Sequence, residues 1–308
     1  MIYTVKAENY LKDSLVFDLA NPEKSGFAII DIQGLGSVKA NISTTESAVS
    51  DGSTYAMSRV GERFITLQIV YWNGTRTAEE SRELLYRIFP VKKPVTLYFK
   101  TEHRDVYIEG YTESHEPTIF SDRCLSTIGI KCPKPYFKSS RIVDTIFTGL
   151  EGGTEFPFKG KEKDSTADKG ILFAEVINKV TRTIDYRGDI PSGITITIDV
   201  LAPFNNITIF KNIANENITI LSDKLIKATG SNFKKGDQVI ITTDLGHKSV
   251  KLYRDGLVYN IFNCLGYNTK WLNLERGLNS FSFNIGSGSS IESLNFKITS
   301  TAELFEGI

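Results

Sequence analysis

Alternation of hydrophobic and polar positions dominates this chain, and it predicts β-strands over most of its length. In the first half, short apolar or alternating runs occupy residues 27–32, 36–44, 63–72, 95–99 and 105–111. In the run at 63–72, apolar residues occupy both odd-numbered and even-numbered positions. We therefore expect this strand to be covered on both faces for part of its length. The first half therefore predicts a β-rich fold.

One stretch of the first half has helical periodicity instead. Thr77 fits an N-cap, and Glu80, three residues later, completes a capping box. Apolar residues then follow at helical spacing as far as Ile88, and Pro90 ends the pattern. We expect a single amphipathic helix over about 77–89, with an apolar side that needs a sheet to cover.

The second half consists almost entirely of predicted strands. Asp255-Gly256 separates two alternating runs and predicts a hairpin with a type I′ turn. Many short strands with regular turn signals are typical of a two-sheet sandwich or a jelly roll. The expected strand regions are 193–200, 206–210, 217–221, 235–244, 249–262, 279–287 and 293–301.

The length of 308 residues suggests about two domains. Pro133 and Pro135 cannot donate to a strand ladder and mark the end of a sheet. A glycine-rich stretch with weak periodicity follows them. We therefore expect an N-terminal domain at 1–137, a linker at 138–158 and a C-terminal domain at 159–308.

Composition and charge exclude several classes of protein. Lys and Arg together number 36, and Asp and Glu also number 36, so the formal net charge is zero. This argues against nucleic-acid binding through a broad basic face, and it removes a barrier to self-association. No apolar run approaches the ~20 residues of a membrane span. The cysteines are too few for a disulfide framework and indicate synthesis in a reducing compartment: Cys124, Cys132 and Cys264.

The search for catalytic chemistry is mostly negative. The histidines have no partner at a metal-ligand spacing, and the chain has no P-loop or nucleophile elbow. We therefore expect no metal, no cofactor and no catalytic residues. A hydrolase remains a further hypothesis because two loose groups of carboxylates could serve a glycosidase. The histidines are His103, His115 and His247, and the carboxylates are Glu109, Glu113 and Glu116, with Asp185 and Asp189.

Two places are candidates for contacts with other molecules. Residues 45–58 are rich in Ser, Thr, Ala and Gly, and they predict a long loop that is mobile in the isolated protein. Trp271 lies in an alternating stretch that could expose its ring to a sugar or to a protein partner. Packing within the sandwich is the alternative role for this tryptophan.

The order of these features resembles the distal tail protein family of siphophages, which are long-tailed bacteriophages with non-contractile tails. In the N-terminal half the resemblance follows the loop at Asp51-Gly52, "RFITLQIVYWNGT", one helix, "VTLYF", "DVYIEGY" and "CPKPYF". In the C-terminal half, "YRGDIPSGITITIDV", "KGDQVIITTD" and "LERGLNSFSFNI" resemble the galectin-like sandwich of the same family. The resemblance covers nearly the whole chain.

This resemblance implies a structural role at the tail tip. The N-terminal belt domains would form a six-fold ring that joins the tail tube to the host-recognition apparatus, and the galectin-like, jelly-roll type β-sandwich would support the host-binding parts. The implied partners are further copies of the chain, the tail tube protein, the tail-associated tip protein and the receptor-binding proteins. The chain would be made in the bacterial cytoplasm and reside in the virion.

The resemblance implies a specific role for the 45–58 loop. We expect Ser47, Asp51, Gly52 and Ser53 to contact a neighbouring ring. We also expect the C-terminal sandwich to be a docking platform without enzymatic activity and with little affinity for sugar. The alternative is a tail module that binds host cell-wall polysaccharide through Trp271.

Overall fold

The computed structural model divides the chain into two units. Unit 1 comprises Met1–Arg141 and Ala302–Ile308, and unit 2 comprises Ile142–Thr301. The structure describes residues 1–46, 48, 51–71, 76–120, 124–141, 144–146, 148–152, 174–178, 181–211, 216–286, 293–300 and 302–308.

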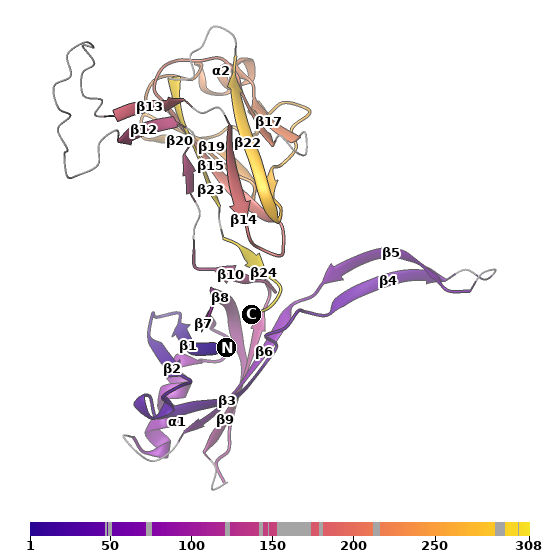
Figure 1. The fold of residues 1–308 in the computed structure, drawn as a ribbon, viewed down its shortest axis with the longest axis vertical. Coiled ribbons are helices and arrows are strands. Elements are labelled where there is room, and N and C mark those ends of the chain that lie inside the picture. The colour runs from indigo at the N-terminus through magenta and orange to yellow at the C-terminus, as the bar shows by residue number, and fades with distance from the viewer. Residues whose placement is uncertain are drawn as a thin grey trace, which may run out of the picture. The chain divides into compact units, whose positions relative to one another are not determined.

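Unit 1 is built on an antiparallel sheet with the strand order β2-β1-β7-β8-β9-β6-β3 (Figure 1). Two short strands extend it, because β10 pairs with both β8 and β24. The strands are β1 (Ile2–Asn9), β2 (Ser14–Asp18), β3 (Phe27–Gln33), β6 (Arg63–Tyr71), β7 (Pro94–Thr101), β8 (Asp105–Pro117), β9 (Leu125–Cys132), β10 (Phe137–Ser139) and β24 (Leu304–Phe305), with the short 3-10 helix η1 (Pro22–Lys24) before β3.

Helix α1 (Ala78–Ile88) follows β6 and confirms the helix predicted from the sequence. Thr77 is its N-cap, and the capping box with Glu80 is complete, since the Glu80 amide donates to Thr77 Oγ1 at 3.2 Å and the Thr77 amide donates to Glu80 Oε2 at 2.8 Å. Leu85 and Ile88 are buried in the core of unit 1. The helix therefore covers one face of the sheet, as its apolar side requires.

Strand β6 shows that only this one face is covered. Ile65 and Leu67 are fully buried, whereas Phe64, on the other face, is 50% exposed. The expectation that this strand is covered on both faces is wrong for the isolated chain. Thr66, Gln68 and Val70, further along the same face of β6, are at intermediate exposure.

Unit 2 is a sandwich of two antiparallel sheets, which confirms the predicted β-rich class. Their inward-facing side chains form a single core that includes Ile196, Ile209 and Phe281. One sheet has the order β11-β23-β15-β18-β19-β20, with β21 paired to β15, and the other has the order β14-β22-β16-β17. The first sheet contains β11 (Asp144–Ile146), β15 (Ser192–Val200), β18 (Gln238–Thr242), β19 (Ser249–Arg254), β20 (Leu257–Asn260), β21 (Asn273–Leu274) and β23 (Leu294–Ser300). The second contains β14 (Thr181–Tyr186), β16 (Ile207–Lys211), β17 (Glu216–Ile220) and β22 (Gly277–Ile285).

One local feature of unit 2 was predicted from the sequence, and another was not. Asp255 and Gly256 join β19 to β20 with φ angles of 51° and 77°, as a type I′ turn requires. Helix α2 (Ser222–Thr229) was not predicted, because its eight residues are too short for a clear period. The remaining elements are the strand pair β12 (Thr148–Gly152) and β13 (Ala174–Asn178), and the 3-10 helix η2 (Phe262–Cys264).

The division into units differs from the predicted domain limits. Part of the predicted linker at 138–158 belongs to sheets, since β10 lies in unit 1 and β11 pairs with β23 in unit 2. Residues 302–308, predicted as the end of the C-terminal domain, belong to unit 1. The reason is the pairing of Phe137 with Phe305, a contact between distant segments that leaves no local pattern in the sequence.

Candidate functional site

The most distinctive element of unit 1 is a long β-hairpin, most of which lies in the range 45–58 that the sequence predicted as a loop. Strands β4 (Ala40–Glu46) and β5 (Ser53–Val60) pair with each other in a separate two-stranded sheet. The hairpin continues the β3–β6 pair and extends away from the main sheet (Figure 1). The prediction of a loop over 45–58 is therefore wrong for most of that range. Its Ser and Thr residues form strands that no other element in the described part of the chain covers.

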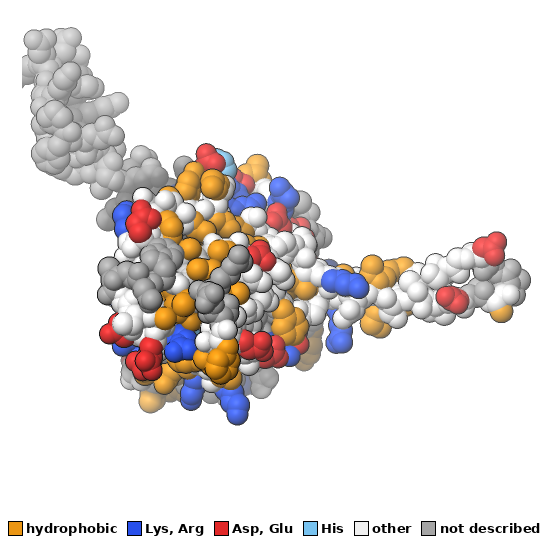
Figure 2. All heavy atoms as spheres, turned by 90° about the horizontal axis from the view of Figure 1, so that it is seen from below, with side chains coloured by type: hydrophobic (Ala, Val, Ile, Leu, Met, Phe, Trp, Pro, Cys, Tyr) orange, Lys and Arg blue, Asp and Glu red, His pale blue; other side chains and the backbone are white. Residues whose placement is uncertain are grey.

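The hairpin exposes large apolar side chains along its length, as Figure 2 shows. Ile42 is 64% exposed and Tyr55 is 61% exposed. The register pairs Ile42 with Ser58 and Thr44 with Tyr55, so Ile42 and Tyr55 lie on one face. A hydrogen bond of 2.8 Å between Tyr55 Oη and Ser58 Oγ holds the tyrosine on this face. An isolated two-stranded ribbon is marginally stable in water, so this apolar face is suited to contact with another molecule.

The predicted contact residues lie at the tip of the hairpin. Asp51 and Gly52 form the bend before β5, and Gly52 has a φ of +90°, which favours glycine. Ser53 is the first residue of β5 and faces Glu46 across the pair. Ser47 lies outside the described residues. Trp271, the remaining candidate, belongs to unit 2.

The base of the hairpin is organised around Arg63, the first residue of β6. Its side chain is only 2% exposed, and its guanidinium donates to the carbonyls of Gly34, Gly36, Pro135 and Glu306. The same guanidinium lies 4.4 Å from the centre of the Phe137 ring. Burial lowers the pKa of Arg63, and the four carbonyls compensate for the lost hydration of the cation. Arg63 thus joins the entry to the hairpin with segments distant in the sequence.

Residues 302–308 complete this base. The Ile308 amide donates to the Leu35 carbonyl at 3.2 Å, and Ser37 Oγ donates to Glu306 Oε2 at 3.2 Å. Arg104 donates to the Gly307 carbonyl at 3.2 Å, with its guanidinium 4.3 Å from the centre of the Phe305 ring. The direction in which the hairpin leaves the sheet is therefore fixed by contacts on both of its sides.

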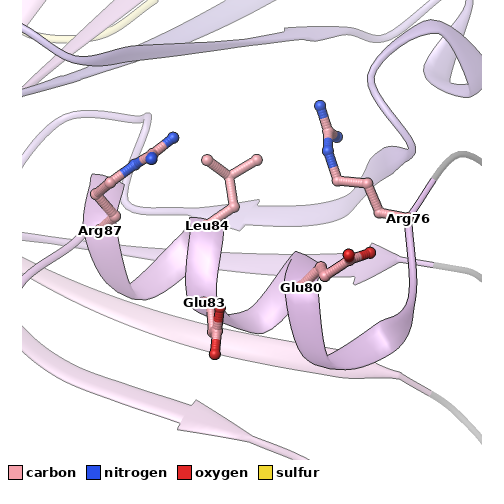
Figure 3. Close-up of a pocket in the computed structure, with 5 residues that line it drawn as sticks. All are labelled: Arg76, Glu80, Glu83, Leu84 and Arg87. Carbon is pink, nitrogen blue, oxygen red and sulfur yellow. The ribbon is translucent and has the colours of Figure 1, made fainter.

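A second feature of unit 1 is a groove of about 530 Å³ beside α1. Figure 3 shows that Arg76 and Arg87 extend to the same side of the helix with Leu84 between them, whereas Glu83 points to the other side. Arg76 donates to the Ser25 carbonyl at 3.0 Å. Glu80, which also lines the groove, is held in the capping box of α1.

Trp271 does not present an open ring for stacking. It is half-buried against the core of unit 2. Its ring centre lies 5.5 Å from that of Phe262, and Lys248 Nζ lies 5.2 Å from it. Its own chain therefore occupies much of the surface that a sugar would need.

The histidines and cysteines form no metal-binding group among the described residues. Cys132 and Cys264 are buried and Cys124 is partly buried, and all three thiols are free. Burial raises the pKa of Cys132 to about 12, so its thiol is protonated and unreactive at neutral pH. In the described part of the chain, no helix has the length and hydropathy needed to cross a membrane.

His115 makes the stability of unit 1 dependent on pH. Burial lowers the pKa of its imidazole from 6.5 to about 4. The unfolded chain therefore takes up a proton near pH 6.5 that the folded chain takes up only near pH 4, and stability is lost as the pH falls between these values. We expect wild-type protein to lose about 2 kcal/mol more than a His115→Gln variant between pH 7.5 and 4.5, after allowance for partial exposure of the ring. Urea titrations of both proteins at the two pH values measure this difference, and equal losses would contradict the assignment.

Comparison with known proteins shows what part of unit 1 is similar to. Residues 23–122, which include the hairpin and the α1 groove, match the family model of the phage tail protein RIFT-related domain. A comparison with curated proteins finds no match. Residues 23–122 of unit 1 are therefore similar to a phage tail protein domain.

The fold of the whole chain matches a solved phage protein. The crystal structure of SPP1 Dit, described as a paradigm of the hub adsorption apparatus in phages that infect Gram-positive bacteria, aligns with a TM-score of 0.61 at 10% identity, over 96% of this chain and 98% of that one. The phage P2 baseplate in its activated conformation with Ca aligns with a TM-score of 0.45 at 15% identity, over 98% and 99%. The predicted resemblance to siphophage distal tail proteins is confirmed by the domain match and by the SPP1 Dit fold.

Proposed function

We propose that this chain is a structural protein of the siphophage tail tip, which assembles into a ring that joins the tail tube to the host-recognition apparatus. The observation that carries the proposal is the β4–β5 hairpin, an exposed arm with an apolar face and a base fixed by Arg63. The fold shared with SPP1 Dit supports a role in an adsorption hub. In this role the chain has no catalytic function and resides in the tail of the virion.

Unit 1 supplies the surface that forms the ring. When an arm on one side of a subunit binds a surface on another side of the next subunit, the contact is head-to-tail. Such contacts close into a ring when the rotation between neighbouring subunits divides a full turn evenly. Six copies would continue the tail tube, with Asp51, Gly52 and Ser53 at the contact with a neighbouring ring. The tail tube protein and the tail-associated tip protein would bind the two faces of the ring.

The mass of the purified protein tests this proposal. Six chains of 34.4 kDa give a particle of about 206 kDa, which mass photometry separates from a monomer. Negative-stain images should show rings with six-fold symmetry. A protein that remains monomeric at micromolar concentrations would contradict the proposal.

Unit 2 serves as a docking platform for receptor-binding proteins. The packing of Trp271 against Phe262 and Lys248 favours this role over the binding of polysaccharide. We expect calorimetric titration of the full chain with host cell-wall polysaccharide to give no saturable heat. Binding at micromolar affinity that Trp271→Ala abolishes would favour the carbohydrate-binding alternative.

A further inference from the structure

The last strand of one sheet in unit 2, β20, has an open edge. It stands at the end of the sheet order next to β19, and in the described part of the chain no strand pairs with its outer side. The Ile261 amide, just after β20, donates to the Val250 carbonyl of β19 at 3.0 Å. Because backbone groups alternate in direction along an antiparallel strand, the amides and carbonyls of Val258 and Asn260 point away from β19. Two residues of β20 therefore have backbone groups available to another strand.

The other sheet of unit 2 protects its edges. Beside β17, the Gly266 amide donates to the Thr219 carbonyl at 2.9 Å, and the Lys270 amide donates to the Asn217 carbonyl at 2.8 Å. Strand β14, at the opposite edge, carries an arginine and an aspartate. Covering segments and charged residues are among the means by which proteins block pairing at an edge. The four residues of β20 include neither a charge nor a proline, so this edge can accept a further strand.

The side chains beside this edge define what a further strand needs to carry. The register places Val258 next to Tyr253 and Asn260 next to Lys251. Val258 is 56% exposed and Tyr253 is 36% exposed, so the first position favours an apolar residue. Lys251 is exposed and has no ion pair with any residue that the structure describes. An added strand is therefore stabilised by an apolar residue opposite Val258 and by an acidic residue two positions away, opposite Asn260.

From these features we infer that β20 receives an extended segment of a receptor-binding protein, which adds a strand to the sheet with an apolar residue opposite Val258 and an acidic residue opposite Asn260. The inference rests on the proposed docking role of unit 2 and specifies its surface and its partner. Backbone hydrogen bonds supply affinity, while Tyr253 and Lys251 supply selectivity. A second copy of β20 is less complementary, because it has no acidic residue to pair with Lys251.

Binding of a model peptide to the full-length chain tests the side-chain preference. The probe is a fluorescein-labelled threonine heptapeptide with a central valine and a glutamate two positions to either side, so it fits β20 in either direction. We expect saturable binding by fluorescence anisotropy, at least tenfold tighter than for the same peptide with lysine in place of glutamate. Lys251→Glu should reverse this preference. Lys227→Glu, at an exposed position of α2, is the matched control and should leave the preference unchanged.

A proline at position 258 tests the backbone contact. Val258→Pro removes an amide that points away from β19, so β20 should remain paired and the thermal midpoint should remain close to that of wild type. We expect peptide binding to weaken at least tenfold, because the added strand loses a hydrogen bond and meets the proline ring. Val258→Ile keeps the amide and the apolar side chain, and it should bind as wild type does. The reversed preference of Lys251→Glu tests the same contact without altering the backbone.

Tails purified from the phage that carries this chain provide the test with the native partner. Amide exchange of residues 257–262, measured by mass spectrometry, should be at least tenfold slower in tails than in the isolated chain. Equal exchange in the two would overturn the inference, as would the absence of saturable peptide binding or equal binding by Val258→Pro and Val258→Ile. Pairing of β20 with a second copy, seen as dimers that Val258→Pro abolishes, would also overturn it. A chain that binds the peptide as expected but forms no ring would contradict the proposed ring and support this contact.

Discussion

A chain in which a short Gly-Ser linker replaces residues 41–59 is expected to fold normally and to remain monomeric. None of these residues belongs to the hydrophobic core of unit 1, so the linker removes no core packing. It does remove the exposed apolar face of Ile42 and Tyr55, which the proposed ring contact would cover. Light scattering coupled to size-exclusion chromatography should give the mass of one chain, and the thermal midpoint should change by no more than a few degrees.

A double substitution tests the apolar face of the hairpin without shortening it. Ile42→Asp combined with Tyr55→Ser keeps the strand pairing but places a charge where a partner would be apolar. We expect it to weaken assembly by at least two orders of magnitude, since burial of two such side chains contributes about 3–5 kcal/mol. Leu245→Asp is the control, because Leu245 is an apolar residue of unit 2 that is even more exposed, at 92%. Normal rings in the double variant would contradict the role of the hairpin.

The largest effect on stability is expected at Arg63. Replacement by alanine leaves the carbonyls of Gly34, Gly36, Pro135 and Glu306 without their donor and removes packing against Phe137. Loss of such a buried polar network costs about 3–5 kcal/mol of the free energy of unfolding. For a unit of this size, that corresponds to a fall of about 10 °C in the thermal midpoint, measurable by differential scanning fluorimetry.

Two further variants test whether this loss of stability depends on the hydrogen bonds of the Arg63 guanidinium. Arg63→Lys keeps the charge but cannot donate in four directions, so we expect it to lose more than half as much stability as Arg63→Ala. Arg59→Ala, at an exposed position of β5, should change stability by about 0.5 kcal/mol or less. An Arg63→Ala protein as stable as Arg59→Ala would show that the base of the hairpin does not depend on this side chain.

Local signals in the sequence were sufficient for several elements. The capping box of Thr77 and Glu80 and the stop at Pro90 lie within one segment, so helix α1 could be located to within a residue or two. The Asp255-Gly256 turn depends on backbone preferences of two adjacent residues, and it too was predicted correctly. The sandwich of unit 2 followed from strict alternation, as at Ile194, Ile196 and Ile198, where one face of each strand is buried.

The β4–β5 hairpin shows why alternation fails elsewhere. A strand is recognised when its own chain buries one face, and no residue of β4 or β5 is buried. A run of Ser and Thr with isolated apolar residues therefore had the pattern of a loop. Arg63 at the start of an apolar strand was the one signal of an unusual environment, and it did not reveal which carbonyls surround it.

The sequence by itself determined the mainly β class, helix α1, the sandwich of unit 2 and the resemblance to siphophage distal tail proteins. Each of these depends on neighbours along the chain or on the order of segments. Only the tertiary structure decided that residues 302–308 return to unit 1, that Arg63 binds carbonyls of three separated segments, and that the stretch at 45–58 is an arm rather than a loop. The first two features arise from contacts between residues up to 243 positions apart, whose pairing is selected by packing and by the need to satisfy buried polar groups. The arm is formed by local pairing, but its strands bury no side chain that would mark them in the sequence.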